Sequence, residues 1–566
     1  MSNLKPFPAT VFAPTSAEAT AKALVEAQVE MEQLITTLLL EPQMPSQAGW
    51  SRSGAVYLIL SSRQALRERY GEEGFRLVDD TLKQLQLAVS AHVDLNALLV
   101  YVDEAASLAP YGLQPVDATH PWKIKGLIES LDACLKTRKQ ALRYLLIVGG
   151  DAIIPFHRLP NPINDQDADV PSDNPYASQD ANYFIPERAI GRLPDGQGEP
   201  VTVLLQLLEE TISAHRRKAA TDKGAWTALL RNLRGDSERE DPRAGLGYSA
   251  SIWRKASRQV LQTLGDHHPL RISPPLTYQE FKQVRYAPFS YFNLHGIEDG
   301  PNWYGQRDAL FPATYELFPV ALRPEDLRPE DYAGAIVFSE ACYGANILGK
   351  NSDTSLALKF LAARARAVIG STKVSYGTVA PPLIGADLLA RYFWKGLLAH
   401  LTIGEALKYA KVSLAREMQE RQGYLDSEDQ KTLLSFVLYG DPALPGLPDG
   451  NIELVSKALC PPLVYQRQAR DQKNLLSESL VAAVKGRIEA SLPYLAEARV
   501  QAVPVILSES EPEMSRAKSR GSRRPVARWA FTLEKDFPVE GDGAHRQVVT
   551  VTVDEHGAIL KAVMSK

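Results

Sequence analysis

Short apolar runs alternate with longer amphipathic stretches along the first third of the chain. The runs at 55–60, 96–102 and 143–150 are rich in leucine, valine, isoleucine and tyrosine, and each predicts a buried strand. Between them, apolar residues recur at helical spacing up to about residue 90 and again near 121–138. Strands that alternate with helices of this length predict βαβ units and a parallel sheet.

The same alternation returns after a loop-rich interval. Residues 155–200 are rich in proline, aspartate and asparagine and predict a long loop that packs over the sheet, with a helix at 199–218 and another polar loop at 235–249. Further strands are predicted at 227–233, 291–296, 335–342 and 366–372, with helices at 251–264 and 383–419 and a closing strand and turn at 433–444.

The pattern changes after about residue 450. One amphipathic helix is predicted at 472–499, and residues 508–525 form a low-complexity segment that is first acidic and then basic. The alternating residues at 527–537 and 546–565 predict antiparallel strands, and the second run holds a hairpin turn at Asp554–Gly557. We therefore expect an α/β protein with a mostly parallel sheet flanked by helices, plus a small C-terminal α+β domain.

These elements divide the chain into four parts. The expected parts are an N-terminal helical segment at 1–50, a first α/β subdomain at 51–225, a catalytic α/β subdomain at 226–447 and a C-terminal accessory domain at 450–566 with a mobile basic linker at 508–525.

Composition narrows the class of protein. The chain has 566 residues, a net charge of −4 and 23% charged residues, which fits a soluble globular protein and gives no sign of nucleic-acid binding. Three cysteines in so long a chain cannot form a disulfide framework. No signal peptide is expected at the N-terminus, and no uncharged apolar run is long enough to span a membrane. We therefore expect a cytoplasmic protein.

Two residues carry candidate chemistry. Cys342 lies in AIVFSEACYGAN and His295 lies in YFNLHGIEDG, and each follows a short apolar run. Parallel strands deliver the residues at their carboxyl ends to one rim of an open sheet, so the thiol and the imidazole can form a nucleophile–base pair. A cysteine in E-A-C-Y-G with a histidine about 50 residues upstream approaches the caspase signature.

Four strings resemble the gingipain family of cysteine peptidases, which belongs to the caspase-like clan. They are LLIVGGDAIIP at 145–155 followed by SDN at 172–174 and AIGRLP at 189–194, HGIEDGPNWYG at 295–305, SEACYG at 339–344, and IGSTKVSYG at 369–377 with LYGDPAL at 438–444. The resemblance covers roughly residues 50–447.

The resemblance implies a caspase-hemoglobinase-type fold and an endopeptidase. Cys342 would be the nucleophile and His295 the base, and the backbone N–H groups of Gly296 and Cys342 would hold the oxyanion. The further candidates that it implies are Asp236 or Glu238 as a carboxylate that orients the histidine, Asp241 at the floor of the specificity pocket, and Trp303 and Tyr376 along its walls. An acidic pocket would favour cleavage after Arg or Lys.

No cofactor is required by this chemistry, although the resemblance also implies calcium binding. Asp165, Asp167 and Asp169 have D-x-D-x-D spacing, but the glycine and glutamate of an EF-hand loop are missing. The alternative is a plain acidic loop.

Other functions fit parts of the sequence. A non-catalytic caspase-like platform would bind a protein partner through 1–50 or 450–566, and the same regions would serve an activating partner of a zymogen. The basic segment 516–524 offers a self-cleavage site if the pocket prefers Arg or Lys. The string at 344–351 has the G-x₄-G-K of a phosphate-binding loop, but Asn351 replaces the hydroxyl residue that holds Mg²⁺. No G-x-S-x-G string marks a serine hydrolase.

Overall fold

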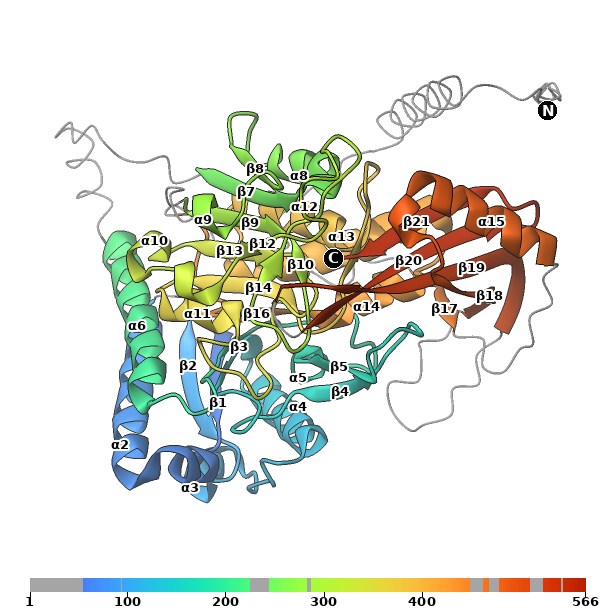
Figure 1. The fold of residues 1–566 in the computed structure, drawn as a ribbon. Helices are drawn as coiled ribbons and strands as arrows, with labels where there is room; N and C mark the ends of the chain where they lie inside the picture. The colour runs from blue at the N-terminus through green and yellow to red at the C-terminus, as the bar shows by residue number, and fades with distance from the viewer. Residues whose placement is uncertain are drawn as a thin grey trace. The chain divides into compact units, whose positions relative to one another are not determined.

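The fold comes from a computed structural model of the chain (Figure 1). The described residues are 54–92, 94–223, 244–281, 287–447, 462–467, 478–508, 523–540 and 543–566. The helix expected within 1–50, the strand expected at 227–233 and residues 516–522 of the self-cleavage segment expected at 516–524 lie outside them.

A ten-stranded sheet forms the centre of the described chain. Its order is β2-β1-β3-β6-β16-β14-β13-β9-β7-β8. The strands are β1 (Ala55–Ser61), β2 (Asn96–Tyr101), β3 (Ala141–Val148), β6 (Ala189–Leu193), β7 (Gly245–Ala250), β8 (Leu270–Ser273), β9 (Phe289–Asn293), β13 (Ile336–Ser339), β14 (Ala367–Ser371) and β16 (Phe436–Gly440).

All neighbours in this sheet are parallel except β14 and β16. The sheet therefore consists of two parallel halves that run in opposite directions and meet at this one antiparallel pair. The predicted mostly parallel sheet is confirmed.

Helices cover both faces of the sheet. On β13, Val337 packs into one core with helices α2 (Arg63–Ser90), α4 (Pro121–Thr137), α6 (Val201–Lys223) and α11 (Leu356–Ala362). The neighbouring residues Ile336 and Phe338 pack into a second core with α8 (Arg254–Leu261), α12 (Gly385–Leu398), α13 (Ile403–Gln422) and α14 (Ser427–Ser435). Successive residues of a strand face opposite sides, so the two cores lie on opposite faces.

Three strands of this sheet, β6, β7 and β8, were not predicted, and the sequences of the first two look like loops. β6 lies within the interval expected to be a long loop, and its Arg192 is wholly buried. The guanidinium donates to Asp173 at 2.6 and 3.0 Å and to backbone carbonyls, which makes a buried charge tolerable in a central strand. β7 has the sequence GLGYSA, whose glycines suggest a turn.

The C-terminal region forms a second sheet of six strands in the order β15-β21-β20-β19-β18-β17. Its strands are β17 (Tyr465–Arg467), β18 (Arg499–Ser508), β19 (Arg523–Pro538), β20 (Ala544–Asp554) and β21 (Ile559–Ser565), with helix α15 at Glu478–Ser491. The remaining strand, β15 (Tyr376–Gly377), belongs to the segment after β14. The last strand of the chain therefore reaches across to the larger sheet, where Figure 1 places the C-terminus.

Candidate active site

His295 and Cys342 follow two adjacent parallel strands. β9 pairs with β13, and Phe292 lies opposite Ser339 near the carboxyl ends of both strands. The two residues therefore emerge at the same rim of the sheet. The backbones are also close, because a Cβ added to Gly296 would lie only 1.9 Å from the Cys342 carbonyl oxygen. Glycine at position 296 is needed for this approach.

A pair of glutamine amides fixes the orientation of His295. Nε2 of the ring lies 2.8 Å from Oε1 of Gln306, which can only accept a hydrogen bond. The Gln306 amide is itself paired with Gln547 of β20 in both directions, at 3.2 and 3.3 Å. Nε2 therefore carries the ring proton, and Nδ1 is left with the lone pair that a general base needs. Sequence reasoning missed both glutamines.

Both reactive groups are buried and neutral in this arrangement. Burial, followed by the nearby His545, holds the pKa of His295 well below its ordinary value. Burial raises the pKa of the Cys342 thiol to about 12. The backbone of Ser375 contacts the sulfur of Cys342 twice. Its N–H donates to Sγ at 3.3 Å, and its carbonyl oxygen lies 3.6 Å from Sγ.

The backbone of Lys566 touches both groups. The Cys342 N–H donates to the Lys566 carbonyl at 3.4 Å, and the Lys566 N–H donates to the Ser375 carbonyl at 2.9 Å. The backbone oxygen of Lys566 also faces the ring of His295 and raises its pKa against the effect of burial. The thiol, the imidazole and this one residue therefore share a single site.

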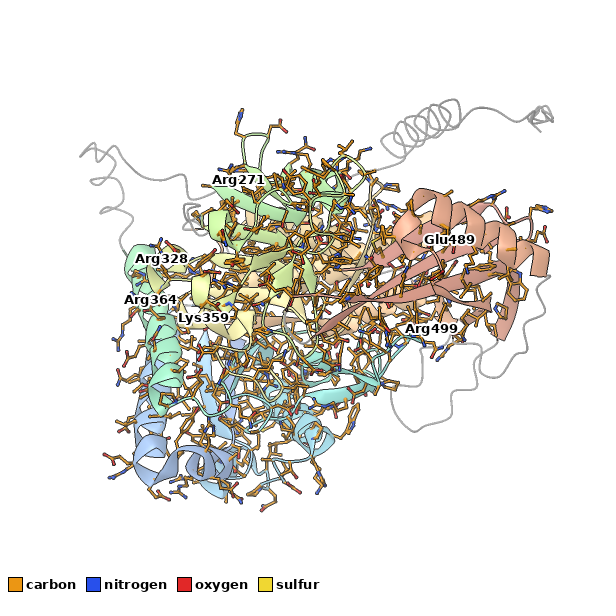
Figure 2. All side chains as sticks on the ribbon, in the orientation of Figure 1. Arg271, Arg328, Lys359, Arg364, Glu489 and Arg499 are labelled. Atoms are coloured by element: carbon orange, nitrogen blue, oxygen red, sulfur yellow. The ribbon has the colours of Figure 1, made fainter. Side chains whose placement is uncertain are left out.

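The side chain of Lys566 enters an acidic chamber beside Cys342. We call this enclosure the lysine chamber and define it by Glu340, Asp387 and Trp253. The ammonium lies 3.2 Å from Glu340 Oε2 and 3.0 Å from Asp387 Oδ1, and 4.4 Å from the centre of the Trp253 ring. Lys566 and both carboxylates are wholly inaccessible to solvent. Charged side chains such as Arg271 and Arg499 are instead exposed on outer strands (Figure 2).

The chamber is built for a cation. Asp387 accepts from the Thr378 N–H at 2.7 Å, and Glu340 accepts from the Tyr291 hydroxyl at 2.6 Å. Burial, followed by the charge of Asp387, raises the pKa of Glu340 well above its ordinary value. Two buried carboxylates this close are costly unless a proton or a cation joins them.

Two of the expected pocket residues, Trp303 and Tyr376, lie within the described residues. Trp303 packs in the core against Phe292 and Phe360, with ring centres 5.5 and 5.9 Å away, and the aromatic ring of the lysine chamber is Trp253. Tyr376 lines the site with its backbone, while its hydroxyl donates to Asp165 at 2.7 Å. Asp236, Glu238 and Asp241 lie outside the described residues. Gly296 pairs with Trp303 in a short antiparallel ladder.

The acidic loop holds an internal ammonium. Nζ of Lys431 lies 2.5 Å from Asp165 and 2.6 Å from Asp167, and all three side chains are wholly buried. Asp169 lies in the short strand β5 (Asp169–Ser172). Within the described ranges, no cluster of three or more His, Cys, Asp or Glu side chains could hold a metal ion.

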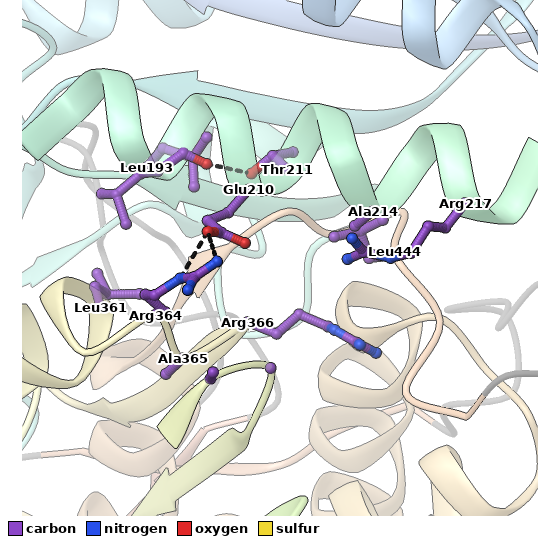
Figure 3. Close-up of a pocket in the computed structure, with 13 residues that line it drawn as sticks. Leu193, Glu210, Thr211, Ala214, Arg217, Leu361, Arg364, Ala365, Arg366 and Leu444 are labelled. Carbon is purple, nitrogen blue, oxygen red and sulfur yellow. Dashed lines mark hydrogen bonds and ion pairs between the residues drawn. The ribbon is translucent and has the colours of Figure 1, made fainter. Parts of the chain in front are cut away.

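A separate pocket lies at the opposite end of β14. Figure 3 shows Glu210 of α6 meeting Arg364, with Arg366 nearby, and the Glu210–Arg364 ion pair measures 2.5 Å. Arg366 directly precedes the first residue of β14, whereas Ser375 and the cleft follow its last residue. This cavity of about 290 Å³ is therefore remote from Cys342.

Comparison with known proteins assigns the family. Residues 53–264 and 325–446 match the model of peptidase family C25, which is the gingipain family. This match spans more than half of the sequence, and the chain belongs to that family. The chain is thus a cysteine-type peptidase, a hydrolase that acts on proteins or peptides.

Two solved structures align with the chain at low identity. One, described only as the structure of a protease, aligns with a TM-score of 0.46 and 11% identity over 91% of this chain and 98% of its own. The crystal structure of the Arg-specific cysteine proteinase gingipain R aligns with a TM-score of 0.42 and 12% identity. The alignment covers 92% of this chain and 99% of that structure's chain. Because both TM-scores are below 0.5, the family assignment rests on the match to the family model alone. No curated protein matches the sequence significantly.

A membrane-spanning segment was not expected from the sequence. Among the described residues, no helix is both long and apolar enough to cross a bilayer.

Proposed function

We propose that this peptidase cuts the peptide bond that follows a lysine, or less readily an arginine, with Cys342 as the nucleophile and His295 as the base. The observation that carries this proposal is the ammonium of Lys566 between Glu340 and Asp387, in a chamber that opens beside Cys342. An acidic chamber selects a basic side chain through charge pairing.

The reaction needs one proton carrier. Nδ1 of His295 takes the thiol proton, and the Cys342 sulfur attacks the carbonyl carbon of the substrate lysine. The Cys342 N–H, which faces the Lys566 carbonyl in the structure, stabilises the oxyanion. When the C–N bond breaks, His295 returns the proton to the leaving amine. Water then hydrolyses the thioester and releases a peptide that ends in lysine.

Lysine fits the chamber better than arginine. The two carboxylate oxygens and the Trp253 ring surround a compact point charge, and the enclosure is closed to solvent. A guanidinium is larger, planar and has five N–H donors that would need partners in the same space.

A panel of fluorogenic peptides tests the proposal. Peptides with Lys, Arg, Asp or Leu before the reporter are incubated with the wild-type chain, with Lys566→Ala, and with each of these carrying Cys342→Ala. We expect cleavage of the lysine peptide first, of the arginine peptide more slowly, and none after Cys342→Ala. Cleavage of only the Asp or Leu peptide, or activity that survives Cys342→Ala, would contradict it.

A further inference from the structure

We infer that strand β21 occupies the substrate cleft of its own chain, with Lys566 in the place of the residue before the scissile bond, so that β21 must withdraw before a substrate can bind. This inference rests on the proposed function, because it identifies the cleft by the chemistry proposed for Cys342 and the lysine chamber.

The backbone of β21 lies as an extended substrate would. Ser565 and Met564 pair with Tyr376 and Gly377 of β15 in an antiparallel ladder. An extended peptide commonly binds by adding a strand to an exposed sheet edge in this manner. The ladder ends at Lys566, whose N–H is bonded to Ser375 and whose carbonyl receives the Cys342 N–H. The backbone oxygen of Lys566 therefore faces the backbone N–H of Cys342, where the carbonyl of a scissile bond would lie.

The side chain of Lys566 is accommodated by a glycine. A Cβ added to Gly377 would lie 2.2 Å from Cε of Lys566 and 2.2 Å from Oδ2 of Asp387. Any larger residue at position 377 would block the entrance to the lysine chamber. The entrance, the carboxylates and the aromatic ring thus form one subsite, which is filled by this chain's own lysine.

The sheet of β21 alone does not require this arrangement. A lysine placed only to end a strand would keep its ammonium in water, since burying it costs free energy even when it is paired. Here the ammonium instead lies inside the protein between two carboxylates. Glu340 directly follows β13, and Asp387 lies in α12.

While β21 occupies the cleft, Cys342 also stays buried and unreactive. Cys342 is buried beneath the strand end, and its thiol and the His295 imidazole are both neutral there. A tethered ligand competes with free substrate at an effective concentration of about millimolar. Withdrawal of the strand would open the chamber and return water to the sulfur.

The first experiment compares hydrolysis of the lysine peptide by the wild-type chain, Lys566→Ala and Lys485→Ala. Lys485 is the matched control, because it lies on α15 and forms an ion pair with Glu489 at 3.6 Å. We expect kcat/KM to rise about tenfold or more for Lys566→Ala and to stay unchanged for Lys485→Ala. Equal rates for wild type and Lys566→Ala would overturn the inference and leave the proposed function standing. If Lys566→Ala does not fold, Lys566→Gln keeps most of the side-chain length and is tested in its place.

The second experiment does not depend on catalysis. The alkylation of Cys342 by iodoacetamide is followed by mass spectrometry, with the partly exposed Cys134 as an internal reference. We expect Cys342 to react about tenfold faster or more, relative to Cys134, when Lys566 is replaced. An unchanged ratio would contradict the occupancy of the cleft. If no peptide is cleaved by any variant, the proposed function fails, and this ratio alone decides the inference.

Discussion

Two buried clusters in this protein combine a lysine with two carboxylates, and we propose different roles for them. Each places one lysine ammonium between two carboxylates. In the loop cluster, Lys431 lies between Asp165 and Asp167 at 2.5 and 2.6 Å. In the lysine chamber, Lys566 lies between Glu340 and Asp387 at 3.2 and 3.0 Å.

The clusters differ in how the lysine is held. Lys431 is in the middle of helix α14, and its carboxylate partners are also bonded to the Tyr343 and Tyr376 hydroxyls. Lys566 follows the end of β21 and is held at the cleft by the pairing of β21 with β15 and by its own backbone bonds to Ser375 and Cys342. The comparison teaches that the charges alone do not distinguish a structural ion pair from the binding site that we propose.

The largest expected effect is on stability. Lys431→Met would leave two buried carboxylates without their cation, and we expect a loss of about 3–5 kcal/mol in the free energy of unfolding. Lys566→Met should cost only about 1 kcal/mol, because water can enter the opened chamber and Glu340 can hold a proton. Urea unfolding of both variants measures the difference. Equal losses in the free energy of unfolding would mean that Lys566 and Lys431 contribute equally to stability.

The second prediction concerns the lysine chamber. In the Lys566→Ala background, Asp387→Asn should lower kcat/KM for the lysine peptide by about 10² or more, because a buried charged hydrogen bond to the substrate is lost. The matched variant Asp167→Asn should reduce stability but keep the preference for lysine over leucine peptides. A preference that survives Asp387→Asn would place the specificity site elsewhere.

The third prediction uses pH. Burial raises the pKa of Glu340 above its ordinary value of 4.5. As the pH rises, Glu340 therefore loses its proton at a lower pH in the unfolded chain than in the folded chain. Stability should therefore fall as the pH rises above about 4.5, with a slope of up to about 1.4 kcal/mol per pH unit, until the folded pKa is passed. Glu340→Gln should lack this contribution. Unfolding curves at several pH values test it, and parallel wild-type and Glu340→Gln profiles would refute it.

The smallest effect is expected outside both clusters. Gln306→Ala should lower kcat about tenfold, because His295 loses the acceptor that fixes its tautomer. The preference for lysine over leucine and the KM for the lysine peptide should stay the same. Gln306→Glu, which restores an acceptor, should recover activity. A change in preference would show that Gln306 contacts the substrate.

The strands that carry the reactive pair were predictable because their signals are local. Apolar runs ended at His295 and at Cys342, and parallel strands bring such ends together. β6 and β7 were missed because the charge of Arg192 and the glycines of GLGYSA suggest loops, and only long-range pairing makes them strands.

The lysine chamber could not be predicted because its members come from four distant segments. One signal was present at each position: Glu340 is a carboxylate directly after an apolar strand, Asp387 lies in an apolar helix, and Lys566 follows an alternating strand. A single sequence does not show which of these charges meet. The same holds for Gln547, which reaches His295 through Gln306 from a region expected to be accessory. The domain boundaries remain predictions.

Covalent capture tests the central claim most directly. A short peptide chloromethyl ketone that ends in lysine is incubated with Lys566→Ala, and the label is located by peptide mass mapping, with a leucine reagent as the control. The account predicts that the lysine reagent labels Cys342 and that Asp387→Asn prevents this. Label on Cys134 or Cys460 instead, or equal labelling of Cys342 by the leucine reagent, would contradict it.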